Sequence, residues 1–235
     1  MKIMVINPNT SISMTDHIRH ALNAIKRNDT DLTVVCPQTG PETIESAYDE
    51  AHAIPPTLAL VKKANQVGID AVVIACFSDP GLHAAREISD IPVIGIEESS
   101  LHVAAMLGAR FSIMTPLRKR IAAKQEEVQR CGMTHFLASV RSLDLTVAET
   151  DTDPVRTKQR IIEEAEKAVQ ADGAEVIILG CAGMAGYASE IEARLKIRVI
   201  DPAAVGLKIA EAAADLGLCH SKIGFYATPP PKRFK

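Results

Sequence analysis

The chain repeats one order of apolar and helical segments, and this repetition restricts the folds open to it. The run GIDAVVIAC ends at Cys76, and the similar run GAEVIILGC ends at Cys181. The offset between the halves is 108 residues for the proline after the first strand, 105 for this cysteine, and 106 for the valine shared by IPVIGI and IRVIDP. A nearly constant offset over separate motifs indicates an internal duplication.

Apolar runs of strand length alternate with segments of helical periodicity in both halves. KIMVI, AVVIAC, FSIMT and VIILGC are apolar on both faces, which is typical of strands in a parallel sheet that helices cover on each side. The sequence therefore predicts the α/β class. We expect two similar parallel-sheet α/β subdomains, related by pseudo-two-fold symmetry, with an active site in the cleft between them.

The predicted boundaries follow the duplication. The first subdomain covers residues 1–97, and its last helix, about 98–108, either stays on it or crosses over to the second. The second subdomain covers residues 109–217, and its closing helix packs either on its own half or on the first. The C-terminal tail, 218–235, ends in FYATPPPKRFK, whose consecutive prolines and basic residues indicate a disordered end or a docking arm rather than a packed segment.

Composition excludes several classes of protein. Apolar residues make up 47% of the 235 residues, which is enough for a globular core. The formal net charge is −3 and no basic block precedes the tail, so we expect neither a nucleic acid nor a membrane as a partner. No run of about 18 apolar residues occurs, and the first apolar run is too short for a signal peptide, so the protein is predicted to be cytoplasmic.

The cysteines and histidines are dispersed along the chain. Five cysteines occur without CxxC spacing, and seven histidines occur without a His/Cys cluster. This pattern predicts free thiols, with neither a disulfide framework nor a metal site. Outside the duplicated pair, we interpret Cys36, Cys131 and Cys219 as structural, because they lack the context of a strand followed by a glycine-containing turn.

The duplicated cysteines occupy positions where chemistry is expected. The carboxyl end of a strand in a parallel sheet faces the crevice in which ligands bind. If the two halves face each other there, Cys76 and Cys181 confront one another across one pocket. Inverting a carbon centre needs a base on one face and an acid on the other, which a thiolate and a thiol can supply. A single thiol at this position is more often a packing residue, and it is the pair that favours catalysis.

The turns after the cysteines add to this hypothesis. FSDPG follows Cys76 and AGMAG follows Cys181, and a helix is predicted to begin in each. Helix N-termini favour anions, so we expect each turn to bias its cysteine toward the thiolate. The exposed N–H groups of the turns can hold the oxyanion of an enolate-like intermediate without a cofactor.

Motifs spread over nearly the whole chain resemble a known family. They resemble the hydantoin racemase and allantoin racemase branch of the aspartate/glutamate racemase superfamily: INPNTS, TIESAYDEA, ACFSDPGL, PVIGIEE, RFSIMT, LGCAGM and VIDP. The resemblance implies a cofactor-independent racemase of 5-substituted hydantoins, with Cys76 and Cys181 as the two acid/base residues. It also implies a small-molecule substrate with a hydantoin-type ring, and a homo-oligomer, either a tetramer or a hexamer.

The resemblance also implies substrate-binding residues: Asn9, Phe77, Ser78, Thr115, Ala182 and Gly183. Asn9 and Thr115 have an alternative role as helix caps, where these residue types are favoured. The sequence departs from the family pattern at Ser78 and Pro116, which leaves the ring substituent open. We expect the pocket for that substituent in the loops around residues 39–48 and 117–120. Glu45 and Tyr48 form either a wall or lid of the pocket or a solvated loop.

Other functions stay open at this point. The superfamily also includes racemases of acidic amino acids, but the residues after the cysteines lack the amide and hydroxyl groups that would suit a free α-carboxylate. A maleate-type isomerase would use one cysteine as a nucleophile. A non-catalytic protein that closes on a small metabolite would share the duplicated architecture but would not need two reactive thiols.

Overall fold

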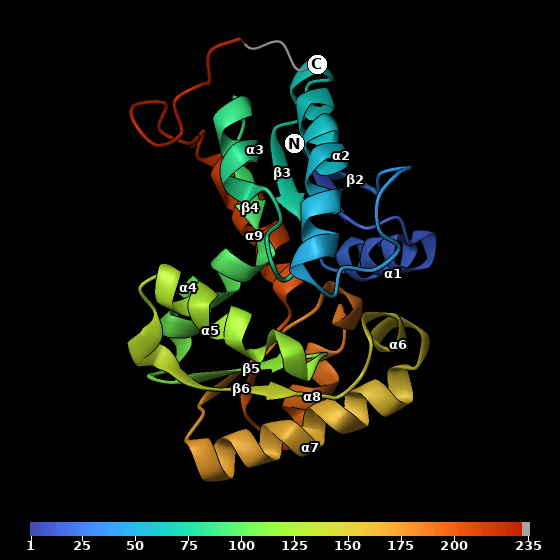
Figure 1. Ribbon diagram of the computed structural model, residues 1–235, viewed down its shortest axis with the longest axis vertical. Helices are drawn as coiled ribbons and strands as arrows, with labels where there is room; N and C mark the ends of the chain where they lie inside the picture. Colours follow the sequence, from blue (N-terminus) through green and yellow to red (C-terminus); the bar gives the residue numbers. More distant parts are fainter. Residues whose placement is uncertain (232–235) are drawn as a thin grey trace.

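Two four-stranded parallel sheets form the protein (Figure 1). The computed structural model describes residues 1–231. The strand order is β2-β1-β3-β4 in the first sheet and β6-β5-β7-β8 in the second, so the two orders correspond strand by strand. This confirms the predicted α/β class with two similar sheets. The strands are β1 (Lys2–Ile6), β2 (Asp31–Val35), β3 (Ala71–Ile74), β4 (Val93–Gly95), β5 (Phe111–Thr115), β6 (Leu137–Ser142), β7 (Val176–Leu179) and β8 (Arg198–Ile200).

Helices cover both faces of each sheet. The α-helices are α1 (Ile12–Asn23), α2 (Ala47–Gln66), α3 (Leu82–Ile88), α4 (Ile96–Leu107), α5 (Ile121–Arg130), α6 (Val147–Thr152), α7 (Pro154–Asp172), α8 (Ala188–Leu195) and α9 (Pro202–Asp215). Single 3-10 turns form η1 (Arg118–Arg120), η2 (Thr134–Phe136) and η3 (Ala182–Met184). Because both faces are covered, the central strands β3 and β7 are buried along their whole length, as their continuous apolar sequence requires.

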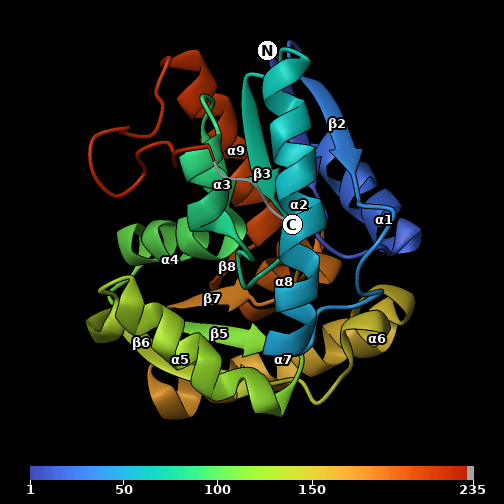
Figure 2. The same ribbon diagram turned by 45° about the horizontal axis from the view of Figure 1, so that its top comes forward.

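The last helix of each half packs on the sheet of the other half. Helix α4 follows β4 but contacts β7 and β8, whereas α9 follows β8 but contacts β1, β3 and β4 (Figure 2). The two helices also pack against each other. Leu101 and Ala104 of α4 join a cluster on the second sheet. Leu207 and Ala210 of α9 join a larger cluster that contains residues of both sheets, together with Ile96 at the start of α4. Each half therefore completes the core of the other.

The tail does not behave as its composition predicts. His220 accepts a hydrogen bond at Nε2 from the N–H of Val93, 2.8 Å away, so it covers the exposed edge of β4. Burial lowers the pKa of His220 to about 4, which keeps the imidazole neutral and able to accept. Lys222 donates to the Arg86 carbonyl, and the Tyr226 hydroxyl contacts the Arg86 guanidinium. The prediction that FYATPPPKRFK does not pack is wrong for Tyr226, and the last part of that segment, 232–235, lies outside the described residues.

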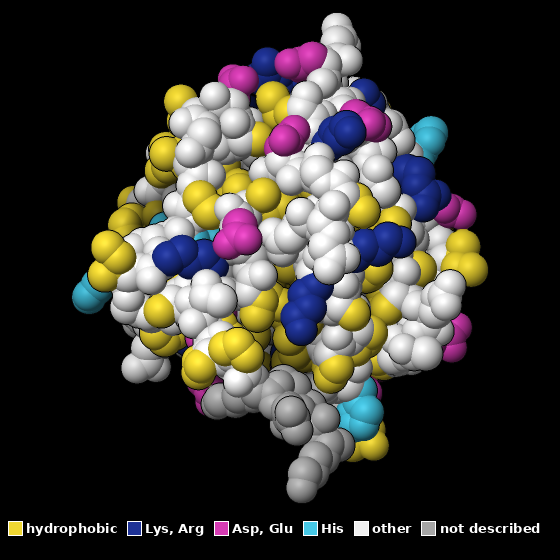
Figure 3. Space-filling view, turned by 90° about the horizontal axis from the view of Figure 1, so that it is seen from above, with side chains coloured by type: hydrophobic (Ala, Val, Ile, Leu, Met, Phe, Trp, Pro, Cys, Tyr) yellow, Lys and Arg dark blue, Asp and Glu magenta, His cyan; other side chains and the backbone are white. Residues whose placement is uncertain are grey.

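Within residues 1–231, no helix has both the length and the apolar character needed to cross a bilayer. On the face shown in Figure 3, basic and acidic side chains are interspersed rather than gathered into a patch of one sign.

The exchange of helices predicts the effect of a substitution at Gly206. A Cβ there would lie 2.7 Å from Ile96 Cγ2 and 3.1 Å from Val73 Cγ1, so α9 can approach α4 and β3 only with glycine at this position. We expect Gly206→Val to lower the free energy of unfolding by about 2–3 kcal/mol, measured by urea denaturation. The control Ala212→Val adds two methyl groups on the exposed face of α9. It should lower the free energy of unfolding by no more than about 0.5 kcal/mol. Equal losses for both variants would contradict this packing.

Candidate active site

One cavity lies between the halves, at the carboxyl ends of β1, β3, β5 and β7. Both duplicated cysteines line it, Cys76 from the first half and Cys181 from the second. The lining also contains most of the residues predicted to bind substrate: Asn9, Phe77, Ser78, Thr115 and Ala182. Gly183 is not in the lining, but its N–H contacts the second thiol. The residues of the duplicated motifs are thus brought together, while their roles stay predictions.

Cys76 lies in a tight turn after β3. Its carbonyl accepts from the N–H of Asp79, 3.0 Å away, which closes the turn. Its thiol lies 3.4 Å from the hydroxyl of Ser78, and either group can donate. Burial raises the pKa of the Cys76 thiol to about 12, and the Ser78 contact offsets only part of that effect.

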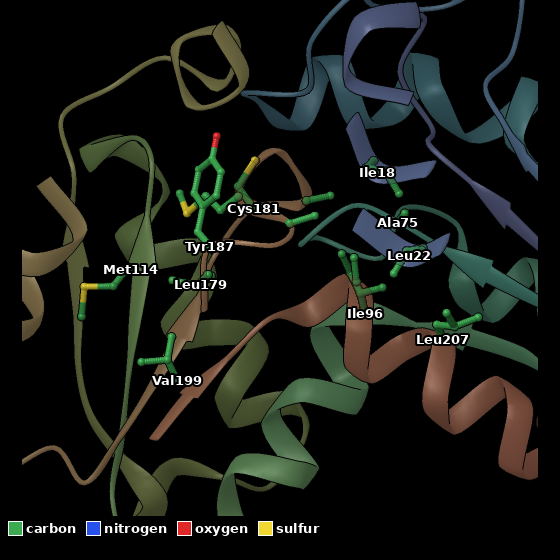
Figure 4. Close-up of a cluster of buried hydrophobic side chains, with 14 of the residues drawn as sticks. Ile18, Leu22, Ala75, Ile96, Met114, Leu179, Cys181, Tyr187, Val199 and Leu207 are labelled. Atoms are coloured by element: carbon green, nitrogen blue, oxygen red, sulfur yellow. The ribbon is translucent and has the colours of Figure 1, made fainter. Parts of the chain in front are cut away.

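Cys181 occupies the corresponding position after β7 (Figure 4). Its Sγ accepts from the N–H of Gly183, 3.4 Å away, and lies 3.6 Å from the hydroxyl of Thr150 on α6. A Cβ at Gly183 would lie only 2.5 Å from Thr150 Oγ1, so the sequence must place glycine there. Burial raises the pKa of the Cys181 thiol as well, against the contacts with Gly183 and Thr150.

The predicted bias of both thiols toward the thiolate is therefore wrong. The prediction rested on helix N-termini, which lower the pKa of a nearby thiol, but burial raises the pKa of both thiols by more. The chain after Cys181 forms a single 3-10 turn, and the chain after Cys76 begins its helix at Leu82, preceded by Gly81 at the cap. Neither arrangement places a long helix dipole directly at the sulfur.

Next to both thiols lie backbone N–H groups that have no backbone acceptor among the described residues; we call these N–H groups open. Those of Phe77 and Ser78, beside Cys76, and that of Ala182, beside Cys181, make no backbone hydrogen bond with residues 1–231. All three residues line the cavity. N–H groups in these positions can donate hydrogen bonds to an oxygen held between the two thiols and so stabilise the negative charge that develops on it.

Asn9 and Thr115 do not cap helices. Ser11 is the residue that caps α1, accepting from the N–H of Met14 at 3.2 Å. Asn9 instead uses its Oδ1 to accept from Asn7 Nδ2 and from the N–H of Ser11, at 2.7 and 2.9 Å. The turn after Thr115 begins beyond Leu117, and no side chain caps it. Both residues are thus buried at the cavity wall.

The mouth of the cavity is built from loops of both halves. The loops around residues 39–48 and 117–120, in which we expect the pocket for the ring substituent, contribute four residues to the wall: Ile44, Glu45, Leu117 and Arg120. Glu45 accepts from the N–H of Val147 at 2.8 Å, and Glu50 on α2 forms an ion pair with Arg120. Tyr48 is 73% exposed and points to solvent. The ion pair and the Glu45 contact join the first half to the second across the opening.

Sequence reasoning missed two charged residues of the wall, Glu50 on α2 and Lys124 on α5. Lys124 on α5 lines the cavity and is buried, with its Nζ on the carbonyl of Phe77 and 2.7 Å from Glu97 Oε2. Its segment, RKRIAAKQEEVQR, is rich in charged residues and reads as a solvated helix, so no local pattern distinguishes Lys124 from its neighbours. Within the described part of the chain, no three His, Cys, Asp or Glu side chains gather as a metal site would require.

Comparisons by family model, by sequence and by structure each match racemases. A family model described as Asp/Glu/Hydantoin racemase matches residues 3–210. The hydantoin racemase of Pseudomonas sp. (strain NS671) is 44% identical over 234 residues, which cover 100% of this chain and 94% of that protein. The allantoin racemase structure from Klebsiella pneumoniae superposes with a TM-score of 0.97 at 37% identity, covering 100% of this chain and 96% of the other. That of Pseudomonas fluorescens gives 0.95 at 34% identity, with both chains fully covered.

The raised pKa of Cys76 predicts how its alkylation depends on pH. Only the thiolate reacts with iodoacetamide, and its fraction increases about tenfold per pH unit below the pKa. We expect the alkylation rate of Cys76, measured on its peptide by mass spectrometry, to rise from pH 7 to pH 10 without reaching a plateau. The exposed Cys219 is the internal control for reagent quality. A plateau below pH 8 would show that the thiolate is already dominant in neutral solution and would contradict this prediction.

Proposed function

Because this chain belongs to the Asp/Glu/Hydantoin racemase family and is a racemase, we propose that it inverts C5 of 5-substituted hydantoins with Cys76 and Cys181 as a thiolate and thiol pair. The observation that supports this most strongly is that both cysteines line one cavity from opposite halves of the chain. Membership of the family removes the interpretation as a non-catalytic binding protein.

The proposed reaction needs one base and one acid on opposite faces of the ring. The thiolate of one cysteine removes the proton from C5, and the electron pair of the C–H bond moves into the neighbouring C4 carbonyl to give an enolate. The thiol of the other cysteine then delivers its proton to the opposite face of C5, and the carbonyl re-forms. The first cysteine ends as the thiol and the second as the thiolate, so the pair is ready for the opposite enantiomer.

The cavity suits the charges of this reaction. The open N–H groups of Phe77, Ser78 and Ala182 can donate to the enolate oxygen, which replaces the electron sink that a cofactor would supply. The high pKa of Cys76 makes its thiolate strongly basic but rare, so at neutral pH the small fraction of thiolate limits the rate of proton abstraction. No metal or cofactor takes part in the proposed mechanism.

The substrate is proposed from the relatives. Hydantoin racemases are among the similar proteins, and allantoin racemases are among the similar structures, so a hydantoin-type ring is common to both. The family description also names Asp and Glu, but a hydantoin racemase matches at 44% identity over the whole chain. Isomerisation of a dicarboxylate has weaker support, because the maleate isomerase structure from Pseudomonas putida S16 is only 16% identical and shares the fold alone. We further propose that the protein is cytoplasmic, as its sequence predicts, and that it forms a homo-oligomer, a tetramer or a hexamer, as the resemblance implies.

The activity can be tested with two substrates in parallel. Purified protein, without added cofactor and with EDTA, is mixed with single-enantiomer allantoin and with single-enantiomer 5-benzylhydantoin, and the optical rotation is followed. We expect the rotation of at least one substrate to decay to zero faster than in the protein-free control. Failure with both, from folded protein whose thiols are reduced, would contradict the proposed function.

Single cysteine variants test whether each thiol exchanges a proton with only one face of C5. We expect Cys76→Ser and Cys181→Ser each to lower the rate of interconversion by at least about a hundredfold, because each lacks one of the two proton carriers. Each variant keeps one thiol and should still exchange the C5 proton of one enantiomer with deuterium oxide without inverting it, as NMR would show. The favoured enantiomer should differ between the two variants. Full racemisation by either variant would rule out the two-base mechanism, and Cys36→Ser is the matched control.

A further inference from the structure

A buried charge cluster lies behind the turn that carries Cys76. Lys124 reaches from α5 of the second half, and its side chain is only 4% exposed. The Nζ atom donates to the carbonyl of Phe77, the residue after Cys76, and to Glu97 Oε2 at 2.7 Å. Removing an ammonium group from water costs several kcal/mol, which a partner only partly offsets. A lysine in this position therefore calls for an explanation beyond stability.

The cluster fixes the same turn at a second point. Asp79 accepts from the N–H groups of Glu97 and Glu98, at 3.1 and 2.8 Å, and so ties the turn to the start of α4. Asp79 has a φ of 44°, a left-handed conformation that a non-glycine residue adopts only when its surroundings impose it. A Cβ at Gly95 would lie 2.3 Å from Asp79 Oδ2, so glycine is required in the motif PVIGIEE for the carboxylate to fit.

The direction of one open donor follows from the Lys124 contact. In a trans peptide unit the C=O and the next N–H point in opposite directions. The carbonyl of Phe77 and the N–H of Ser78 belong to one such unit, so holding the carbonyl on Lys124 fixes the Ser78 N–H on the other side. A charged donor on the carbonyl also polarises the peptide and strengthens its N–H as a donor. The Ser78 N–H has no backbone partner among the described residues.

From this geometry we infer that Lys124 is a positioning residue of the racemase: it orients the Ser78 N–H toward the substrate oxygen and places a positive charge in the wall of the cavity that both thiols line. This inference rests on the proposed function. Lys124 does not exchange a proton with the substrate, and it acts through the Cys76 turn. The family motifs contain no lysine, so the role is assigned from the contacts of Lys124 alone.

The charges that face the thiols agree with this role. Lys124 lowers the pKa of both Cys76 and Cys181, whereas Glu50 raises that of Cys76 and Asp151 raises that of Cys181. Burial raises the pKa of Asp79 to about 7 and that of Glu97 to about 8. At neutral pH neither carboxyl group is fully ionised, so each opposes the positive charge of Lys124 only in part.

Two variants separate positioning from stability. Lys124→Met removes the charge but leaves Glu97 buried without its partner, which threatens the fold. The double variant K124M/E97L removes both members of the pair, and replacing a buried pair by apolar residues of similar volume is often neutral for stability. Lys124→Arg keeps the charge, and Lys62→Met is the matched control on the exposed face of α2. Thermal unfolding monitored by circular dichroism establishes which variants are folded.

Activity and thiol reactivity are then measured on the folded variants. We expect K124M/E97L to lower kcat at least about tenfold with little change in KM, and to shift the rising limb of the pH–rate profile to higher pH. Its Cys76 should be alkylated at least about threefold more slowly than in the unsubstituted protein at pH 8. Lys124→Arg should recover part of kcat, and Lys62→Met should match the unsubstituted protein.

A folded double variant with unchanged kcat, pH profile and Cys76 alkylation would overturn the inference and leave Lys124 as a structural ion pair. Alkylation needs no substrate, so it decides the question even if the unsubstituted protein racemises no hydantoin. In that case the proposed function fails, and slower alkylation would still support the action of Lys124 on the thiol. Unchanged alkylation would then overturn the inference too.

Discussion

The carboxyl ends of two parallel sheets face one cavity, and the other features of the site depend on that arrangement. Strands of a parallel sheet all end on the same side, and the residues just beyond those ends face outward from the sheet. Placing two such ends against each other puts one turn of each half on opposite walls of the same space. Each turn brings a thiol with open N–H groups beside it. The duplication of the sequence thereby becomes a pair of similar chemical groups on the walls of one cavity.

The arrangement is held by contacts that cross between the halves. Helix α4 packs on the second sheet and α9 on the first, so neither sheet has a complete core without the other half. Around the cavity, Lys124, the Glu50–Arg120 pair and the Glu45 contact with Val147 all join residues of different halves. These contacts fix the relative position of the two thiols, on which a reaction that passes a proton from face to face depends.

Sequence reasoning was most successful where local patterns carry the information. Continuous apolar runs predicted the parallel strands, and the repeated strand-and-cysteine motif predicted that Cys76 and Cys181 share a cavity. It was less successful where long-range contacts decide the outcome. Lys124 is one of several lysines and arginines in its segment, and only the folded chain shows that it is buried. The packing of His220 and Tyr226 depends on β4 and α3, and desolvation of the thiols depends on how the two halves close around them.

Deuterium labelling during the first few per cent of turnover tests the two-thiol mechanism most directly. One pure enantiomer is incubated with the protein in deuterium oxide, and the two enantiomers are separated on a chiral column and analysed by mass spectrometry. If one thiol removes the proton and the other supplies the new one, the product enantiomer carries deuterium at C5 while the remaining substrate stays largely unlabelled. Equal labelling of both enantiomers from the start would show that one group, or the solvent, serves both faces and would contradict the account.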